Sequence, residues 1–258
     1  RQRQMCIRDS MYGVEEVAQA NDYDIIVVTT NGNDTKPLER LIQNRKVDGM
    51  ILTRTYENDK YVKFLKQKQI PFVAVGKFPD DDVVQVDHDN VGACKELVTV
   101  LFAKGIQNIA YLGSNMDQMV NRCRYQGYEE AYRKGKRKLN QDLVYTDLSS
   151  KAMVEKAVEE LKKSGVECIL CQDDYICDEA VRKLSHMGVR IPDQMKVASC
   201  HYSRILENYP VTVTSLKFNI TELGRRSCQV LLDMIHGKTV PDKTLLDYEI
   251  ILKESTKG

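Results

Sequence analysis

Residues 92–113 read GACKELVTVLFAKGIQNIAYLG, and this stretch contains the repeating unit that decides the fold. Its first part places apolar residues three or four apart and stops at Gly105, which predicts a helix. The run NIAYLG that follows is apolar nearly throughout instead of alternating, which is typical of a strand covered on both faces. Because this alternation of helix and strand recurs along the chain, we expect an α/β fold with parallel sheets.

Strand character recurs in a series of short runs, and segments of helical period lie between most of them. A tail adds a helix from Asn219 to about His236 between two further strands. These make about eight repeats plus the tail, more than one sheet usually holds, so we expect two doubly wound parallel-sheet lobes. The runs are DIIVVTT from Asp24, GMILT from Gly49, PFVAVG from Pro71, VVQV from Val83, NIAYLG from Asn108, ECILC from Glu167, KVASC from Lys196, VTVTSL from Val211 and LDYEIIL from Leu246.

The start of the chain breaks the pattern. The first helical segment, MYGVEEVAQAN from Met11, has no strand before it, and in residues 1–10 only Met5, Cys6 and Ile7 are consecutively apolar. We therefore expect that the first strand is missing and that residues 1–10 are a non-native or misassigned segment.

The composition indicates an ordinary globular protein, with 258 residues of which 42% are hydrophobic and 29% charged. The net charge is +1, and residues 1–10 alone contribute +2, so the rest of the chain is nearly neutral. It has no excess of basic residues that would indicate binding to a polyanion. The basic cluster between Arg133 and Lys138 flanks Gly135, where a helix end favours cations, although a phosphate contact is an alternative.

The sequence also indicates the compartment. No run approaches the roughly 18 to 20 apolar residues that a membrane span needs, and residues 1–10 lack the apolar centre of a signal peptide. The eight cysteines share no short regular spacing, which favours reduced thiols over a disulfide framework. We expect a cytoplasmic protein without a membrane partner.

Motifs for catalysis or metal binding are missing from the sequence. Cys168 and Cys171 have C-x-x-C spacing, but residues three apart in a strand face opposite sides of the sheet and cannot share a metal ion. There is no G-x-G-x-x-G, no phosphate loop and no G-x-S-x-G. His88 has no Ser or Cys partner at a suggestive spacing, and Asp89-Asn90 after it resembles a helix cap. We predict that the protein is not an enzyme and has no catalytic residue, no cofactor and no metal.

The motifs taken in order resemble the effector-binding core of the lactose/galactose-repressor (LacI/GalR) family over about residues 12 to 252. Within that family, VDHDN, the V-x-x-x-R-x-x-G-Y arrangement at 120–128 and the triplet at 201–203 are most similar to maltose-operon repressors. The motifs are GVEEVAQANDYDIIVV, VDGMIL, IPFVAVGK, VDHDNVGA, FAKGIQNIAYLG, RYQGYEEAY, QDDYICDEAV, MGVRIPDQMKVAS and PVTVTSLKFNITELGRRSCQVLLDMIHGK.

This resemblance implies a fold like that of type I periplasmic binding proteins, with three hinge crossings and a small-molecule effector between the lobes. The N-terminal lobe would comprise residues 11–86 and 219–240, and the C-terminal lobe residues 87–214 and 244–253. The implied function is that of a sugar-responsive transcriptional regulator, a repressor of maltose, maltodextrin or related carbohydrate genes. Its implied partners are a carbohydrate effector, a second copy in a homodimer, and operator DNA contacted through a helix-turn-helix domain absent from this chain. The alternative is the solute-binding protein of a sugar transporter.

Arg124 matches the effector-contacting arginine of the family, whose planar donor fork can grip adjacent ring hydroxyls. A helix that begins near residue 120 would place it close to the positive end of the helix dipole, where the backbone gives a cation no stabilisation. The alternative interpretation pairs Arg124 with a nearby carboxylate such as Asp117.

Two further positions follow predicted strands. Asp173 aligns with a cleft-facing polar residue of the family and is a candidate acceptor for a ligand hydroxyl, whereas Asp174 is most simply the N-cap of the next helix. His201 stands where sugar-binding relatives carry Asp or Asn; a neutral imidazole can bond one hydroxyl, and a buried, satisfied histidine is the alternative.

Phe218 and Lys77 complete the candidate set. Phe218 lies at the last hinge crossing and offers a flat apolar face to a pyranose ring, unless it is an ordinary core residue. Lys77 aligns with a basic position of the family, either at the rim of the cleft or as a solvated lysine.

Overall fold

The computed structural model describes residues 3–30, 34–56, 58–79 and 82–257, with the side chains of residues 3–7 excepted. The chain forms two compact units and passes between them three times. Unit 1 comprises Arg1–His88 and Asn219–Leu246, and unit 2 comprises Asp89–Phe218 and Asp247–Gly258. Each unit contains a sheet with helices, so the predicted α/β fold with parallel sheets is confirmed.

Unit 1 contains a parallel sheet in the order β1-β2-β3-β9. Phe72 and Ala74 of β2 pack with α2 and α3, while Val73 between them packs with α9. Both faces of the strand are therefore covered, which is why its sequence is apolar throughout. The elements are α1 (Arg3–Gln19), α2 (Lys36–Gln43), β1 (Met50–Leu52), α3 (Lys60–Lys68), β2 (Phe72–Val75), β3 (Gln85–His88), α9 (Ile220–Ile235) and β9 (Lys243–Leu246).

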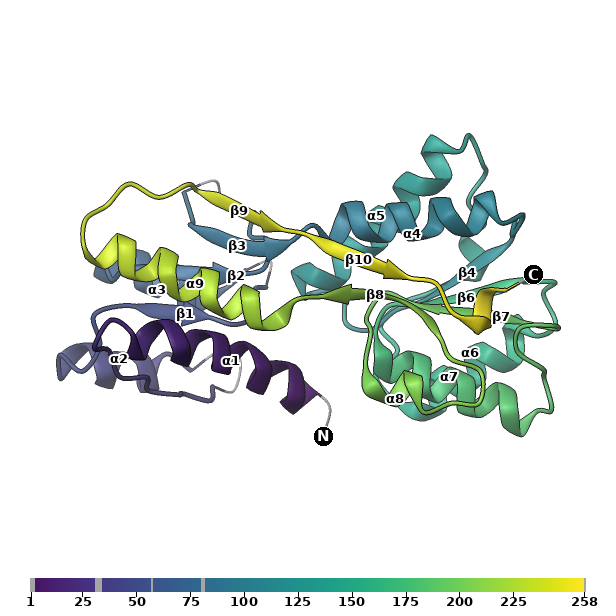
Figure 1. Cartoon of the computed structure of the whole chain (residues 1–258), viewed down its shortest axis with the longest axis horizontal. Helices are drawn as coiled ribbons and strands as arrows, with labels where there is room; N and C mark the ends of the chain where they lie inside the picture. Colours follow the sequence, from purple (N-terminus) through teal and green to yellow (C-terminus); the bar gives the residue numbers. More distant parts are fainter. Residues whose placement is uncertain (1–2, 31–33, 57, 80–81, 258) are drawn as a thin grey trace. The chain divides into compact units, whose positions relative to one another are not determined.

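Helices α1 and α9 of unit 1 approach each other so closely that only glycine fits at the contact (Figure 1). A Cβ atom on Gly13 would lie 2.0 Å from the main-chain oxygen of Thr221, and one on Gly224 would lie 2.0 Å from that of Ser10. Arg225 adds an ion pair of 2.8 Å to Glu16. Ser10, placed by the sequence in a non-native segment, is thus part of a helix that packs against α9.

The predicted strand from Asp24 is wrong, because residues 23–30 form no strand. Ile26 and Val27 are 48% and 62% exposed. A strand is stabilised by hydrogen bonds to a neighbouring strand, and among the described residues the sheet of unit 1 ends at β1 without pairing to this segment. The segment therefore has the apolar pattern of a strand but no neighbouring strand to pair with among the described residues.

Unit 2 contains a sheet in the order β10-β8-β7-β6-β4-β5, parallel except for the antiparallel pair of β10 and β8. Figure 1 shows α4 and α5 on one face of this sheet and α6 and α7 on the other. The elements are α4 (Asn90–Ala103), β4 (Ile109–Leu112), α5 (Met119–Lys134), β5 (Val144–Tyr145), α6 (Lys151–Leu161), β6 (Cys168–Cys171), α7 (Asp174–His186), β7 (Lys196–Ser199), α8 (Arg204–Glu207), β8 (Thr214–Phe218) and β10 (Tyr248–Ile251), with short 3₁₀ turns at Gln141–Leu143 and Glu254–Thr256.

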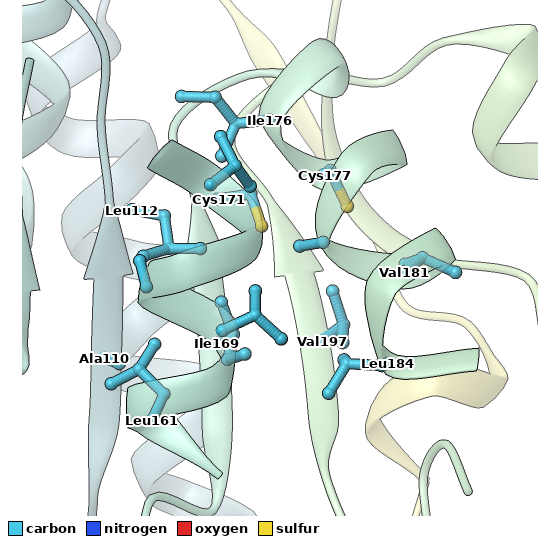
Figure 2. Close-up of a cluster of buried hydrophobic side chains, with 14 of the residues drawn as sticks. Ala110, Leu112, Leu161, Ile169, Cys171, Ile176, Cys177, Val181, Leu184 and Val197 are labelled. Carbon is cyan, nitrogen blue, oxygen red and sulfur yellow. The ribbon is translucent and has the colours of Figure 1, made fainter. Parts of the chain in front are cut away.

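The core of unit 2 fills both faces of the sheet. On one face Ile169 and Cys171 of β6 pack with α6 and α7 (Figure 2). On the other face the ring of Tyr111 in β4 lies 5.1 Å from that of Tyr128 in α5, measured between centroids. Cys168 is buried outside the cluster that contains Cys171, as the alternation of side chains in a strand requires.

None of the helices in the described part of the chain is both long enough and apolar enough to cross a membrane.

Candidate functional site

The candidate site lies in unit 2 where parallel strands end. Gln172 follows β6 directly, His201 lies two residues after β7, and Phe218 is the last residue of β8. Ser114 lies two residues after β4. Ligands of open α/β sheets bind outside the carboxyl ends of the strands, so these positions form the edge at which a ligand is expected.

Arg124 of α5 lies at the centre of a group that also contains His201 and Phe218, called the Arg124 cluster below. Arg124 is only 8% exposed. Its Nε donates to Oδ1 of Asn90 at 3.2 Å, and its Nη1 donates to the main-chain oxygen of Gln172 at 2.9 Å. Both acceptors are neutral, and Asp117 is exposed instead of paired with Arg124 in the described structure. Helix α5 begins at Met119, so Arg124 lies in its second turn, farther from the positive helix end than the sequence predicted.

The two acceptors are themselves held firmly. Asn90 is the first residue of α4, whose predicted cap is confirmed: the Asp89 side chain accepts from the main-chain nitrogen of Gly92 at 2.8 Å. Gln172 is fully buried, and its Oε1 accepts from the main-chain nitrogen of Ser114 at 2.8 Å. A Cβ on Gly113 would lie 2.8 Å from that Oε1, so glycine allows the loop after β4 to approach β6. These contacts fix the guanidinium before any ligand arrives.

Phe218 faces two groups of the cluster. The guanidinium carbon of Arg124 lies 5.7 Å from the centroid of its ring, within the range of a cation–π interaction. The ring of His201 is stacked with Phe218 at a centroid distance of 6.3 Å and an interplanar angle of 18°. The structure therefore brings Arg124, His201 and Phe218 together, and their shared role in binding a ligand stays a prediction.

His201 is kept neutral by its surroundings. Burial, and secondly the positive charge of Arg124, lower the pKa of the imidazole from 6.5 to about 4, while the negative charge of Asp173 opposes them. At neutral pH the ring thus carries one donor and one acceptor nitrogen, which suits a hydroxyl group better than an anion.

The N-cap of α7 is Asp173 and not Asp174 as expected, whereas the role of Asp173 in ligand binding stays a prediction. Asp173 is the N-cap of α7, and its Oδ1 accepts from the main-chain nitrogen of Ile176 at 2.8 Å. Asp174 is the first residue of the helix, and burial raises the pKa of its carboxyl although Ser203 and the charge of Arg124 lower it. The interpretation of Asp174 as the cap was wrong, because the helix begins at Asp174, one residue earlier than the sequence pattern indicated.

Lys77 belongs to unit 1, where its side chain is exposed. Its main-chain nitrogen donates to Oδ2 of Asp87 at 3.1 Å, and its main-chain oxygen accepts from Oγ1 of Thr55 at 2.9 Å. Its role in ligand binding stays a prediction from the sequence.

The sequence did not single out Asn90, Ser114 or Gln172 as parts of the site. Each is a polar residue that follows a strand within two residues, and this position was the available signal. Their partners lie far away in the sequence, so no local pattern identifies the contacts. Among the described residues, no group of three or more His, Cys, Asp or Glu side chains is arranged to hold a metal ion.

Known proteins resemble this chain over nearly its whole length. A family model described as periplasmic binding proteins and sugar binding domain of LacI family matches residues 2–254. The HTH-type transcriptional regulator CelR of Thermobifida fusca is 25% identical over 250 residues, which cover 94% of this chain and 74% of that protein. The HTH-type transcriptional regulator MalR of Streptococcus pneumoniae serotype 4 is 26% identical over 254 residues, which cover 93% of this chain and 74% of that protein.

The fold is also found in solved structures. The structure of a transcriptional regulator CelR–cellobiose complex matches with a TM-score of 0.88 and 24% sequence identity, over 97% of this chain and 79% of that one.

Proposed function

Since this chain belongs to the family of periplasmic binding proteins and sugar-binding domains of the LacI type, we propose that its Arg124 cluster binds the carbohydrate effector of a transcriptional regulator. The predicted family resemblance is confirmed, and MalR is among the relatives. The matching curated proteins named above are transcriptional regulators, which favours a regulator over the solute-binding protein of a transporter. Transcriptional regulators are not enzymes, in line with the prediction from the sequence.

The proposal rests on the guanidinium of Arg124, because only some of its N–H donors form hydrogen bonds to described residues. A guanidinium has five N–H donors. Only two of its hydrogen bonds, to Asn90 and Gln172, are made to described residues, although the side chain is nearly buried. The remaining donors are fixed in one plane, a geometry that matches two adjacent hydroxyl oxygens of a sugar ring.

The other members of the cluster complete a surface for a polyol. Phe218 supplies an apolar ring against which the carbon face of a pyranose can pack. Neutral His201 supplies one donor and one acceptor. Burial lowers the pKa of His201, which the negative charge of Asp173 opposes, and burial raises the pKa of Asp174, which the positive charge of Arg124 opposes. Two carboxyl groups thus lie near the cluster, which favours an uncharged sugar over an anionic one.

The remaining parts of the function follow from the family. The chain spans about three quarters of the length of the curated relatives, 74% in each case. We infer that the intact regulator acts in the cytoplasm as a homodimer and contacts operator DNA through a further N-terminal domain. Effector binding would then change operator affinity through a coupling of about 1 to 3 kcal/mol, typical of allosteric proteins. Repression of maltose, maltodextrin or related carbohydrate genes is the form of regulation that we propose.

Thermal unfolding of the purified chain with a panel of small molecules tests the proposal. The panel contains maltose, a maltodextrin, cellobiose, a galactoside, ribose, gluconate as an anionic sugar acid, and a purine as a compound of another class. A neutral sugar at 100 times its Kd is expected to stabilise the native state by about 2.7 kcal/mol and thereby raise Tm. If only gluconate raised Tm, the preference for an uncharged sugar would be wrong; if only the purine did, the proposed class of effector would be wrong.

A further inference from the structure

Two thiols lie next to each other behind the candidate site. The Sγ atoms of Cys94 in α4 and Cys200, which follows β7, are 3.6 Å apart. Both residues are fully buried. They are 106 positions apart in the sequence, so the contact is a product of the fold. Neither residue has a place in the proposed binding of the sugar.

We propose that Cys94 and Cys200 form a reversible disulfide that joins α4 to the loop carrying His201. In a disulfide the sulfurs are about 2.05 Å apart, so the two Sγ atoms, now at 3.6 Å, have to approach by about 1.5 Å. The oxidant is a small-molecule disulfide such as glutathione disulfide. One protein thiolate attacks it and releases one thiol; the second protein thiolate then attacks the mixed disulfide and releases the other. The protein pair loses two protons and two electrons, and the oxidant becomes two thiols.

The packing around Cys94 directs the sulfur toward Cys200. A Cβ on Gly127 of α5 would lie 2.9 Å from the Cβ of Cys94, so α5 closes off that side of α4. The main chain of Cys200 is held to the end of β6, because its nitrogen donates to the oxygen of Cys171 at 2.8 Å. Closing the bond thus needs a rotation of the side chains together with a small shift of α4 relative to the loop after β7.

Burial also sets the rate of this reaction. It raises the pKa of the Cys94 thiol well above its ordinary value, so little of the reactive thiolate is present at neutral pH. The pair therefore stays reduced in the closed native state and reacts when unit 2 opens locally. A bound effector that suppresses this opening is expected to slow the oxidation.

The bond would act on the site through both of its ends. Cys94 lies one helical turn after Asn90, the partner of Arg124, and Cys200 directly precedes His201, which stacks with Phe218. Drawing the sulfurs together shifts the start of α4, which carries Asn90, relative to the loop that carries His201. This consequence rests on the proposed sugar site, whereas formation of the bond does not.

The experiment uses the chain with Cys6→Ser, because the side chain of Cys6 lies outside the described residues. The protein is incubated with glutathione disulfide, free thiols are blocked with iodoacetamide, and the digested peptides are identified by mass spectrometry. A peptide pair linked through Cys94 and Cys200, reversed by dithiothreitol, is expected. A link between Cys171 and Cys177, which also lie close together, or no link after full reaction, would overturn the proposal.

Matched variants separate the bond from its effect on the sugar. Cys94→Ser and Cys200→Ser should abolish the linked peptide, whereas Cys168→Ser, at a buried thiol on the opposite side of β6 from Cys171, should retain it. If a serine variant fails to fold, the peptides of the Cys6→Ser protein still show whether Cys94 and Cys200 are linked. Oxidation is expected to weaken binding of the stabilising sugar about tenfold. A linked peptide with unchanged sugar affinity would remove the regulatory role, and its formation would stand even if no sugar bound.

Discussion

Nη1 of Arg124 in α5 donates a hydrogen bond of 2.9 Å to the main-chain oxygen of Gln172, the residue that follows β6. This bond ties a helix to the end of a strand 48 positions away and sets the plane of the guanidinium. The orientation of the central donor group is thereby determined by the protein.

Replacing Arg124 with lysine should weaken sugar binding about 10- to 100-fold while the fold is retained. Lysine keeps the charge but cannot bond Asn90 and Gln172 while offering a planar donor pair to the ligand. Isothermal titration calorimetry measures the change. Arg122→Lys is the control, since Arg122 donates to the oxygen of Met116 and affinity there should change less than twofold. Equal losses in the two variants would contradict the role of Arg124.

Asp173→Ala should lower the free energy of unfolding by about 1 kcal/mol, because the N-cap of α7 is lost. Asp173→Asn should restore most of it, since asparagine caps as well as aspartate does. Urea denaturation measures both variants. Ser150→Ala, which removes the cap of α6, is the control for an effect on stability alone. If Asp173→Asn bound sugar much more weakly at full stability, the carboxylate would contact the ligand as the sequence predicted.

The stability of the protein should fall as the pH drops from about 6.5 to about 4. The pKa of His201 is lowered to about 4 in the folded protein from an ordinary value of 6.5, so the unfolded chain binds the proton more tightly. The contribution of the neutral ring is present above pH 6.5 and decreases by up to about 3 kcal/mol as the pH falls to 4. Urea denaturation across this range measures it. The pH dependence should flatten in His201→Asn, and an unchanged profile in that variant would assign the effect to other groups.

Gly224→Ala should destabilise unit 1 by about 2 to 4 kcal/mol, because the new methyl group would lie 2.0 Å from the main-chain oxygen of Ser10. Gly135→Ala is the control. There the nearest atom is 3.3 Å from the added Cβ and φ is −75°, so the cost should stay below about 1 kcal/mol. Thermal and urea unfolding compare the two variants. Similar stabilities would show that α1 does not pack closely against α9.

Val27→Thr should change the free energy of unfolding by less than about 0.5 kcal/mol, because Val27 is 62% exposed and belongs to no strand. Val73→Thr places the same hydroxyl at a fully buried position of β2 and should cost about 1 to 3 kcal/mol. Urea denaturation distinguishes them. A comparable loss in both variants would indicate that residues 23–30 are buried in a sheet after all.

The sequence predicted most elements because their signals are local. The period of α4 and the continuous apolar run of β4 lie within a few residues, and both elements formed where expected. The strand from Asp24 carried an equally clear apolar pattern and did not form, because pairing requires a neighbour that lies elsewhere in the chain. The wrong cap for α7 has a similar origin: a shift of one residue in the helix start decides whether Asp173 or Asp174 becomes the cap.

The amino-acid order alone determined the parallel α/β class and the family resemblance and made Arg124 a candidate for ligand binding, since each rests on residue types at short spacings. Only the tertiary structure decided which oxygens hold the guanidinium, that His201 is stacked with Phe218, and that Cys94 meets Cys200. These contacts join residues tens of positions apart, and the packing of α4 and α5 on the sheet determines their distances. Close packing of whole elements fixes such distances, and no local period in the sequence encodes them.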